Sequence, residues 1–165
     1  MKNVFLCGFM GCGKSTVGQK LAALLNVPFV DMDSYIEKKN KMTVKEMFSK
    51  YSESYFRAQE HCACWELSKI NGAVVALGGG TVLNPMNVEV LKKKCEIVFL
   101  DAPLDVIKKR LENDHTRPLL ERPDREQAME QLYEKRRPSY RKTATLVIDA
   151  DNSPEYLAQV IASRL

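Results

Sequence analysis

The sequence predicts an α/β fold in which a parallel sheet lies between two layers of helices. Short runs that are apolar throughout alternate along the chain with segments that have helical spacing. Runs of this kind are typical of strands that are buried on both faces of a parallel sheet. No internal repeat, linker or second domain is recognisable, so residues 1–165 are expected to form a single domain.

Five short apolar runs are predicted to be strands. They cover residues 3–7, 28–30, 73–77, 96–100 and 145–149. In parallel sheets, ligands collect at the carboxyl ends of the strands. The residues that fall at these ends are Asp31, Asp33, Gly78, Gly79, Gly80 and Asp101. They are therefore the first candidates for a ligand site.

The segments between the strands are predicted to be helices, and several carry start signals. Thr43 and Glu46 have the spacing of a capping box, and Asn84 is followed by a first-turn proline. Predicted helices cover residues 14–25, 54–70 and 127–137, and others begin near residues 34, 43, 85, 103 and 154. Residues 112–126 are polar and contain two prolines, which predicts an exposed, mobile loop.

The composition excludes several classes of protein. The chain is 45% hydrophobic and 28% charged, as in ordinary globular proteins, and its net charge of +4 comes without a long basic run. We expect anionic small molecules as partners, no nucleic acid, no membrane and a cytoplasmic location. The five cysteines have no framework spacing, and we expect reduced thiols, with His61, Cys62 and Cys64 on a buried helix face.

The stretch GFMGCGKST, residues 8–16, matches the P-loop pattern and lies between a predicted strand and a predicted helix. Glycines at positions 8 and 13 let the backbone curl so that its N–H groups point at phosphate oxygens. The helix that follows adds its positive N-terminal end. Lys14 is placed to reach the outer phosphates and Ser15 to ligate Mg²⁺, so the loop predicts a nucleoside triphosphate site.

Several classes of protein contain a P-loop, and other features of the sequence separate them. A guanine-specific switch would carry Asn-Lys-x-Asp, and the only Asn-Lys, at Asn40, lacks the aspartate. Adenine is therefore the expected base. The length excludes a large motor or transporter ATPase. A small kinase or a nucleotide-binding regulator remains.

Other charged residues are open to two interpretations each. In a regular strand Asp31 and Asp33 would share a face, with one on Mg²⁺ through water and one on a substrate hydroxyl, but Asp33 could instead cap a helix beginning at Ser34. Arg57 and Glu60 have i, i+3 spacing, which also fits a solvated surface pair. Arg136 and Arg137 end a predicted helix, where cations suit the helix dipole.

Together these stretches resemble the shikimate kinases in order and spacing. The resemblance covers nearly the whole chain and rests on GFMGCGKSTVGQKLA, FVDMDSYIE, FRAQE, VVALGGGTVL, VFLDAP, TRPLL and EKRRPSYRKTA. It implies the fold of nucleoside monophosphate kinases, a five-stranded parallel sheet in the order 2-3-1-4-5. It also implies transfer of phosphate from Mg-ATP to the 3-hydroxyl of shikimate, in the pathway to aromatic amino acids.

The resemblance implies roles for individual residues. On the nucleotide side, ATP would be bound by Gly11, Cys12, Gly13, Lys14, Ser15, Thr16, Arg110, Arg117, Asn152 and Pro154, with Mg²⁺ on Ser15 and, through water, Asp31. On the acceptor side, in a region of about residues 33–60 and beyond, shikimate would contact Asp33, Arg57, Gly78, Gly79, Gly80 and Arg136. Lys14, Asp33 and Arg117 would be catalytic, with Asp33 a candidate proton acceptor, Glu60 orienting Arg57, and Arg117 on a lid of about residues 112–125.

The sequence departs from the pattern of the shikimate kinases at two points, and two alternative functions stay open. Residues 151–153 are acidic and polar, so adenine contacts there are expected to come from the backbone. Cys12 stands where Ala or Ser is commoner; it is either a small filler or an oxidation- or alkylation-sensitive thiol that ATP would shield. The alternatives are another small-molecule kinase, such as a gluconate kinase, and a regulator without a substrate. Nothing in the sequence demands more than a monomer.

Overall fold

A computed structural model describes all 165 residues and has one five-stranded sheet. The strands are β1 (Asn3–Cys7), β2 (Phe29–Asp31), β3 (Val74–Ala76), β4 (Cys95–Asp101) and β5 (Leu146–Asp149). All pairings are parallel, and the order β2-β3-β1-β4-β5 confirms the order implied by the resemblance. Every residue of β1 and β3 is buried, as expected for central strands covered on both faces.

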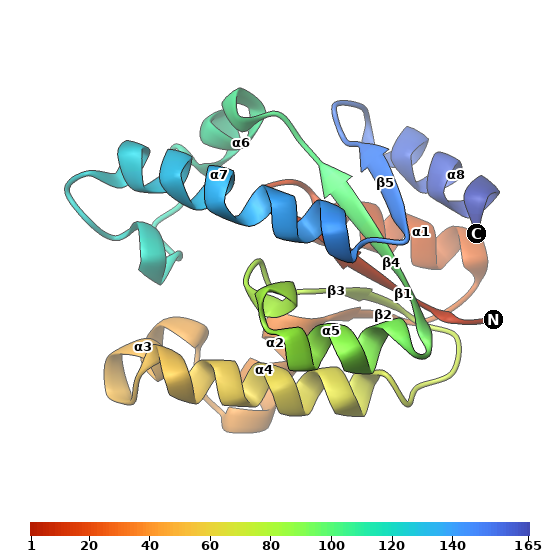
Figure 1. The fold of residues 1–165 in the computed structure, drawn as a ribbon, viewed down its shortest axis with the longest axis horizontal. Helices are drawn as coiled ribbons and strands as arrows, with labels where there is room; N and C mark the ends of the chain where they lie inside the picture. Colours follow the sequence, from red (N-terminus) through yellow and green to blue (C-terminus); the bar gives the residue numbers. More distant parts are fainter.

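Eight α-helices surround the sheet (Figure 1). They are α1 (Lys14–Leu25), α2 (Met32–Asn40), α3 (Val44–Lys50), α4 (Glu53–Leu67), α5 (Pro85–Lys92), α6 (Leu104–Leu111), α7 (Arg125–Thr143) and α8 (Pro154–Arg164), with 3₁₀ turns η1 (Thr81–Leu83) and η2 (Pro118–Leu120). In the view of Figure 1, α5 and α7 lie in front of the sheet, whereas α1 packs with α8 behind it.

The predicted start signals are confirmed where the helices begin. The hydroxyl of Thr43 accepts from the N–H of Glu46, and the Glu46 carboxylate accepts from the N–H of Thr43, which completes the capping box of α3. Asn84 caps α5 and Ser153 caps α8 through their side chains, each followed by a proline. These local signals depend on few neighbours, so they can be read from sequence.

The second strand, predicted over residues 28–30, covers Phe29–Asp31, and a helix follows it at once. Asp31 is the last residue of β2 and also the N-cap of α2, where its Oδ1 accepts from the N–H of Ser34 at 3.0 Å. Asp33 therefore lies in the first turn of a helix. The expectation that two aspartates share one face of a strand is wrong, and so is the alternative that Asp33 caps a helix beginning at Ser34.

Helix α7 is longer than predicted. It continues past Arg137 through Pro138 to Thr143, so Arg136 and Arg137 lie in its interior and not at its end. A proline inside a helix removes one backbone hydrogen bond. Side chains on both sides of Pro138 are bound to the sheet and its loops, because Arg137 pairs with Asp101 and Tyr140 donates to the carbonyl of Gly79. These tertiary contacts offset the local loss.

The cysteines are distributed differently from the expectation of one buried helix face. All five are free thiols; Cys7 and Cys95 lie in strands, Cys12 lies in the P-loop, and only Cys62 and Cys64 lie on a helix. Cys64 is buried and Cys62 is exposed. None of the helices combines the length and the apolar character that crossing a membrane would require.

Candidate active site

A cleft of about 840 Å³ opens at the carboxyl ends of the strands, where the sequence placed the ligand site. Its walls come from the P-loop, the ends of β2 and β3, the start of α3 and the segment before α7. The predicted site residues that line it are Gly11, Cys12, Gly13, Lys14, Ser15, Thr16, Asp31, Asp33, Gly78, Gly79, Arg110, Arg117, Asn152 and Pro154. The other three predicted residues do not line it. Gly80 belongs to the glycine loop, residues 78–80, that forms one wall, and Arg57 and Arg136 lie directly against this loop.

The P-loop backbone requires glycine at its turning points. Gly8 and Gly13 have φ angles of 148° and 98°, and Gly13 is the N-cap of α1. A Cβ at Gly8 would lie 2.8 Å from the carbonyl oxygen of Leu100, so backbone as well as conformation excludes a side chain there. The Nζ of Lys14 donates to the carbonyls of Gly8 at 2.8 Å and Phe9 at 3.1 Å, which holds this charge over the loop.

Cys12 does not have the exposure that an alkylation-sensitive thiol needs. Its side chain is buried, and its Sγ would lie 2.7 Å from a Cβ at Gly8, so the sulfur fills the space beneath the loop. Its burial favours the interpretation of Cys12 as a small filler over that of a reactive thiol.

Ser15 and Asp31 form a pair of oxygen donors beside the P-loop. The Oγ of Ser15 donates to Oδ2 of Asp31 at 2.6 Å, and the other carboxylate oxygen caps α2. A hydroxyl and a carboxylate are hard oxygen ligands of the kind that Mg²⁺ prefers alongside waters and phosphates. The donor set present here fits that ion.

Asp33 is a half-buried residue whose Oδ1 atom is buried and has no hydrogen-bond partner. Burial raises the pKa of Asp33 to about 6, and the carboxylates of Glu60 and Asp31 add to the shift, while Lys14 and Arg117 oppose it. A buried acceptor left unpaired is destabilising unless a ligand satisfies it. The side chain lines the cleft, so a substrate hydroxyl can supply the missing donor.

Arg57 and Glu60 form a pair in which Glu60 is buried and Arg57 is half-buried, and not the solvated pair that their spacing left open. The side chain of Glu60 is 1% exposed, and its Oε1 accepts from Nη1 of Arg57 at 2.5 Å. Its Oε2 accepts from the hydroxyl of Thr81 at 2.6 Å, and Glu53 contacts the outer side of the guanidinium. Both oxygens of Glu60 are thus used to orient neighbouring groups, as the resemblance implied for Arg57.

The three glycines after β3 allow charged side chains to approach the backbone closely. A Cβ at Gly78 would lie 2.7 Å from Oε2 of Glu60, and one at Gly80 would lie 2.7 Å from Cζ of Arg57. A Cβ at Gly79 would lie 3.4 Å from Nη1 of Arg136. The loop therefore brings two guanidinium groups from different helices to the same short stretch of backbone.

Arg136 reaches this loop from α7, opposite α4. Arg136 is only 5% exposed. One turn further along α7, the hydroxyl of Tyr140 donates to the carbonyl of Gly79 at 2.6 Å. Figure 1 shows α7 above and α4 below the loop that follows β3. Arg57 and Arg136 thus converge on the loop from two helices, an arrangement that suits a small carboxylate.

The segment between α6 and α7 carries Arg117. Nε of Arg117 donates to Oδ2 of Asp114 at 3.2 Å, and the N–H of Thr116 donates to Oδ1 of the same carboxylate at 2.8 Å. Arg117 lines the cleft, and its positive charge opposes part of the rise in the pKa of Asp33. Most of the segment is exposed, as its composition predicted, and Leu120 anchors it in the core.

The far end of the cleft is formed by Arg110, Asn152 and Pro154. Nη1 of Arg110 donates to the carbonyl of Gly11 at 3.1 Å, which fixes the side chain across the P-loop. Asp151 does not line the cleft. Arg110 is the one charged residue of these three, so a nucleotide base could lie here beside the protein backbone.

Sequence reasoning missed several residues of the cleft. Thr43, Val44 and Lys45 at the start of α3 form the wall opposite the P-loop, and Glu37 holds this start by accepting from the N–H of Val44 at 2.9 Å. The capping box located α3 in the chain, but only the packing of α3 shows that it faces the cleft. Asp114, which holds Arg117, carried no signal in the sequence beyond its place in the polar loop.

One cleft thus combines a P-loop at the end of β1, the oxygen donors of Ser15 and Asp31, and the unpaired carboxylate oxygen of Asp33. Arg117 lines the same cleft. These features define a P-loop kinase of small molecules. The sequence model of the family described as shikimate kinase matches residues 10–165. The chain belongs to the shikimate kinase family, and it is an ATP-dependent kinase.

Individual relatives support this membership. The chain is 42% identical to a shikimate kinase of Sulfurihydrogenibium sp. over 166 aligned positions, which cover 100% of this chain and 98% of that protein. It superposes with a TM-score of 0.96 on the shikimate kinase of Acinetobacter baumannii in complex with shikimate, at 36% identity over 99% of this chain and 92% of that one. A gluconokinase from Sinorhizobium meliloti, with a TM-score of 0.67 and 16% identity over 96% of this chain and 87% of that one, shares the fold alone.

Proposed function

We propose that this protein transfers the γ-phosphoryl group of Mg-ATP to the 3-hydroxyl of shikimate, which yields shikimate 3-phosphate and ADP. The single observation that carries the proposal is the environment of Asp33: a buried, unpartnered carboxylate oxygen between the P-loop and the Arg57–Glu60 pair. A solved relative at 36% identity is a complex with shikimate, which supports the choice of acceptor.

In this proposal the nucleotide lies along the P-loop. Backbone N–H groups of residues 11–16 bind the phosphates, Lys14 leaves the loop carbonyls for the outer phosphates, and Arg110, Asn152 and Pro154 flank the adenine. Ser15 and Asp31 would hold Mg²⁺, Asp31 through water. The ion supplies charge neutralisation at the transferring phosphate.

Shikimate would occupy the pocket beside the glycine loop. Its carboxylate accepts hydrogen bonds from the guanidinium groups of Arg57 and Arg136, whose planar forks match a carboxylate. The glycine loop, residues 78–80, lets the ring approach the backbone. The 3-hydroxyl donates to Asp33, which satisfies the free oxygen and places a base of pKa about 6 on the attacking group.

Phosphoryl transfer needs alignment and positive charge more than covalent chemistry. Arg117 would supply that charge as the lid, residues 112–125, closes over both substrates and excludes water. A regulator without a substrate would need none of the acceptor pocket. The Arg57–Glu60 pair, in which Glu60 is buried, and Arg136 therefore favour an enzyme. We propose that the protein works as a monomer, since nothing in the sequence demands a second chain.

The proposal is tested by the position of the phosphate in the product. Shikimate and Mg-ATP are incubated with the protein, with a chelator control, and the mixture is analysed by phosphorus NMR. A new phosphomonoester signal coupled to the ring proton at C3 is expected, and only with Mg²⁺. Unmodified shikimate, or phosphate on another hydroxyl, would contradict the proposal.

A further inference from the structure

Asp101 is the one charged strand-end residue from the sequence that does not line the cleft. It is the last residue of β4, and its side chain is 10% exposed. It faces a separate cavity of about 430 Å³ that is also lined by Tyr133, Arg137 and Arg141 of α7. The role of this carboxylate therefore has to be sought in α7.

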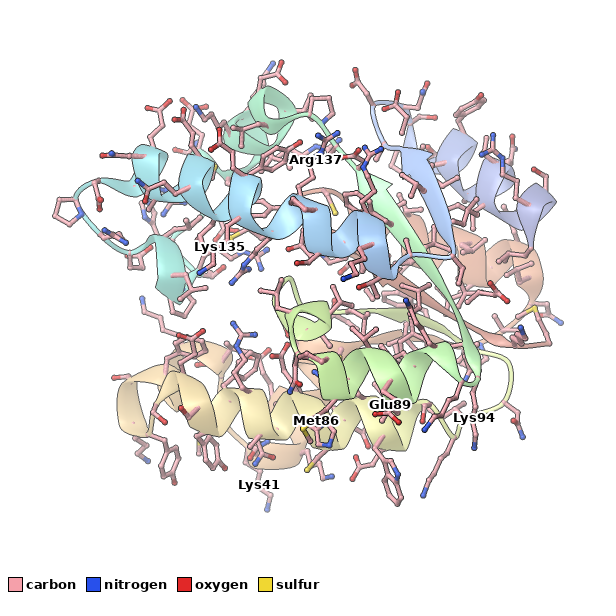
Figure 2. The ribbon with its side chains drawn as sticks, viewed as in Figure 1. Lys41, Met86, Glu89, Lys94, Lys135 and Arg137 are labelled. Atoms are coloured by element: carbon pink, nitrogen blue, oxygen red, sulfur yellow. The ribbon has the colours of Figure 1, made fainter.

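Two arginines of α7 bind the same carboxylate. Arg137 is bidentate, with Nε donating to Oδ1 of Asp101 at 2.9 Å and Nη2 donating to Oδ2 at 2.8 Å. Nη2 of Arg141 donates to Oδ2 at 2.6 Å. Figure 2 shows Arg137 on the side of α7 that faces the ends of β4 and β5. A bidentate pair constrains both direction and distance.

These contacts belong to a row along one side of α7. Tyr133, Arg137 and Arg141 are spaced by four residues, and the hydroxyl of Tyr133 donates to the carbonyl of Ala102 at 3.0 Å. The whole row is therefore bound to the end of β4 and the residue after it. It fixes α7 at three consecutive turns.

The neighbouring row carries the substrate-facing groups. Arg136 and Tyr140 lie one residue before the first row, about 100° around the helix, and both contact the glycine loop at Gly79. A rotation of α7 by about 10° would move a group roughly 6 Å from the axis by about 1 Å. A displacement of about 1 Å in a bound group is enough to cost up to about 10²-fold in rate or affinity.

We infer that Asp101 is a positioning residue that sets the rotation of α7 about its axis and thereby holds the Arg136 guanidinium against the glycine loop. The inference rests on the proposed function in that Arg136 is taken to bind the acceptor carboxylate. The Asp101 side chain is 10% exposed and its partners are 44% and 56% exposed, so its loss is expected to lower stability as well. The feature that marks a positioning role is therefore a rise in the KM for shikimate without a matching rise in the KM for ATP.

The test is the Asp101→Asn variant, assayed with shikimate and Mg-ATP. We expect the KM for shikimate to rise about tenfold, with kcat and the KM for ATP within about twofold of wild type. Asp149→Asn is the matched control, since Asp149 ends the neighbouring strand and lines the same cavity but forms no ion pair. It should leave all three constants unchanged. Arg137→Lys keeps the positive charge but cannot form the bidentate contact with Asp101. It should raise the KM for shikimate as Asp101→Asn does, and it provides the test if Asp101→Asn folds poorly.

Arg136→Ala separates the inference from the proposed function. If Arg136→Ala leaves the KM for shikimate unchanged, the assigned role of Arg136 is wrong. If it raises that KM while Asp101→Asn and Arg137→Lys do not, the inference about Asp101 is wrong. The double variant Asp101→Asn/Arg136→Ala should bind shikimate no more weakly than Arg136→Ala alone, because the positioned group is gone. An additive loss, or equal rises in both KM values for Asp101→Asn, would overturn the inference.

Discussion

Asp33→Asn should make the metal-free, ligand-free protein more stable while it removes activity. In the folded chain Oδ1 of Asp33 is buried without a partner, and the carboxylates of Glu60 and Asp31 lie near it. Burial raises the pKa from 3.8 to about 6, and each unit corresponds to about 1.4 kcal/mol. The ionised carboxylate therefore destabilises the folded state by about 3 kcal/mol at neutral pH.

The sign follows from the proton balance. Between pH 3.8 and about pH 6, Asp33 has lost its proton in the unfolded chain but keeps it in the folded chain. Asp33 therefore makes the free energy of unfolding fall as the pH rises through this range. Below the window both states are protonated and the variant gains nothing from the missing charge. Above it the gain is complete, because the amide is neutral at every pH.

The assay is urea unfolding of wild type and Asp33→Asn in a chelator and without nucleotide. We expect the variant to be more stable by about 2–3 kcal/mol near pH 7, with the difference shrinking towards zero near pH 4. A variant of equal or lower stability at neutral pH would refute the reasoning. A gain that is the same at both pH values would also refute it, since it would not come from ionisation.

Four further outcomes are expected. Asp33→Asn should lower kcat by at least about 10²-fold, the low end of general-base effects, and a near-normal kcat would leave Asp33 no role in proton transfer. Arg57→Ala should raise the KM for shikimate far more than that for ATP, and equal changes would argue against a carboxylate clamp. Gly80→Ala should displace the Arg57 guanidinium and weaken shikimate binding with little change in stability, as measured by KM and urea unfolding. A thiol reagent at neutral pH should label Cys62 rapidly and the four buried cysteines slowly, and peptide mapping would expose any other order.

The local parts of this site could be predicted from the sequence because they depend on neighbours in the chain. The P-loop is a contiguous backbone shape with glycines where the φ angle is positive, and the structure places Gly8 and Gly13 in that conformation. The cap at Thr43 and the strand at residues 3–7 are of the same kind. Family resemblance then supplied the strand order, which apolar runs alone do not specify.

The remaining parts depend on packing between distant segments. Spacing placed Arg57 beside Glu60, but only the contact of Glu60 with Thr81 and the glycine loop buries the Glu60 side of that pair. The helix predicted over residues 127–137 continues through Pro138 to Thr143, where contacts of α7 with Asp101 and Gly79 hold it. In both cases tertiary contacts outweigh a correct local preference.

The central claim is that shikimate is the phosphoryl acceptor, and release of ADP from Mg-ATP tests it most directly. The assay compares shikimate, gluconate and a panel of nucleoside monophosphates, with the protein alone as the background. The account predicts rapid ADP release with shikimate and background rates with every other compound. Background rates with shikimate alongside tight ATP binding, or faster release with gluconate or a nucleotide, would contradict it.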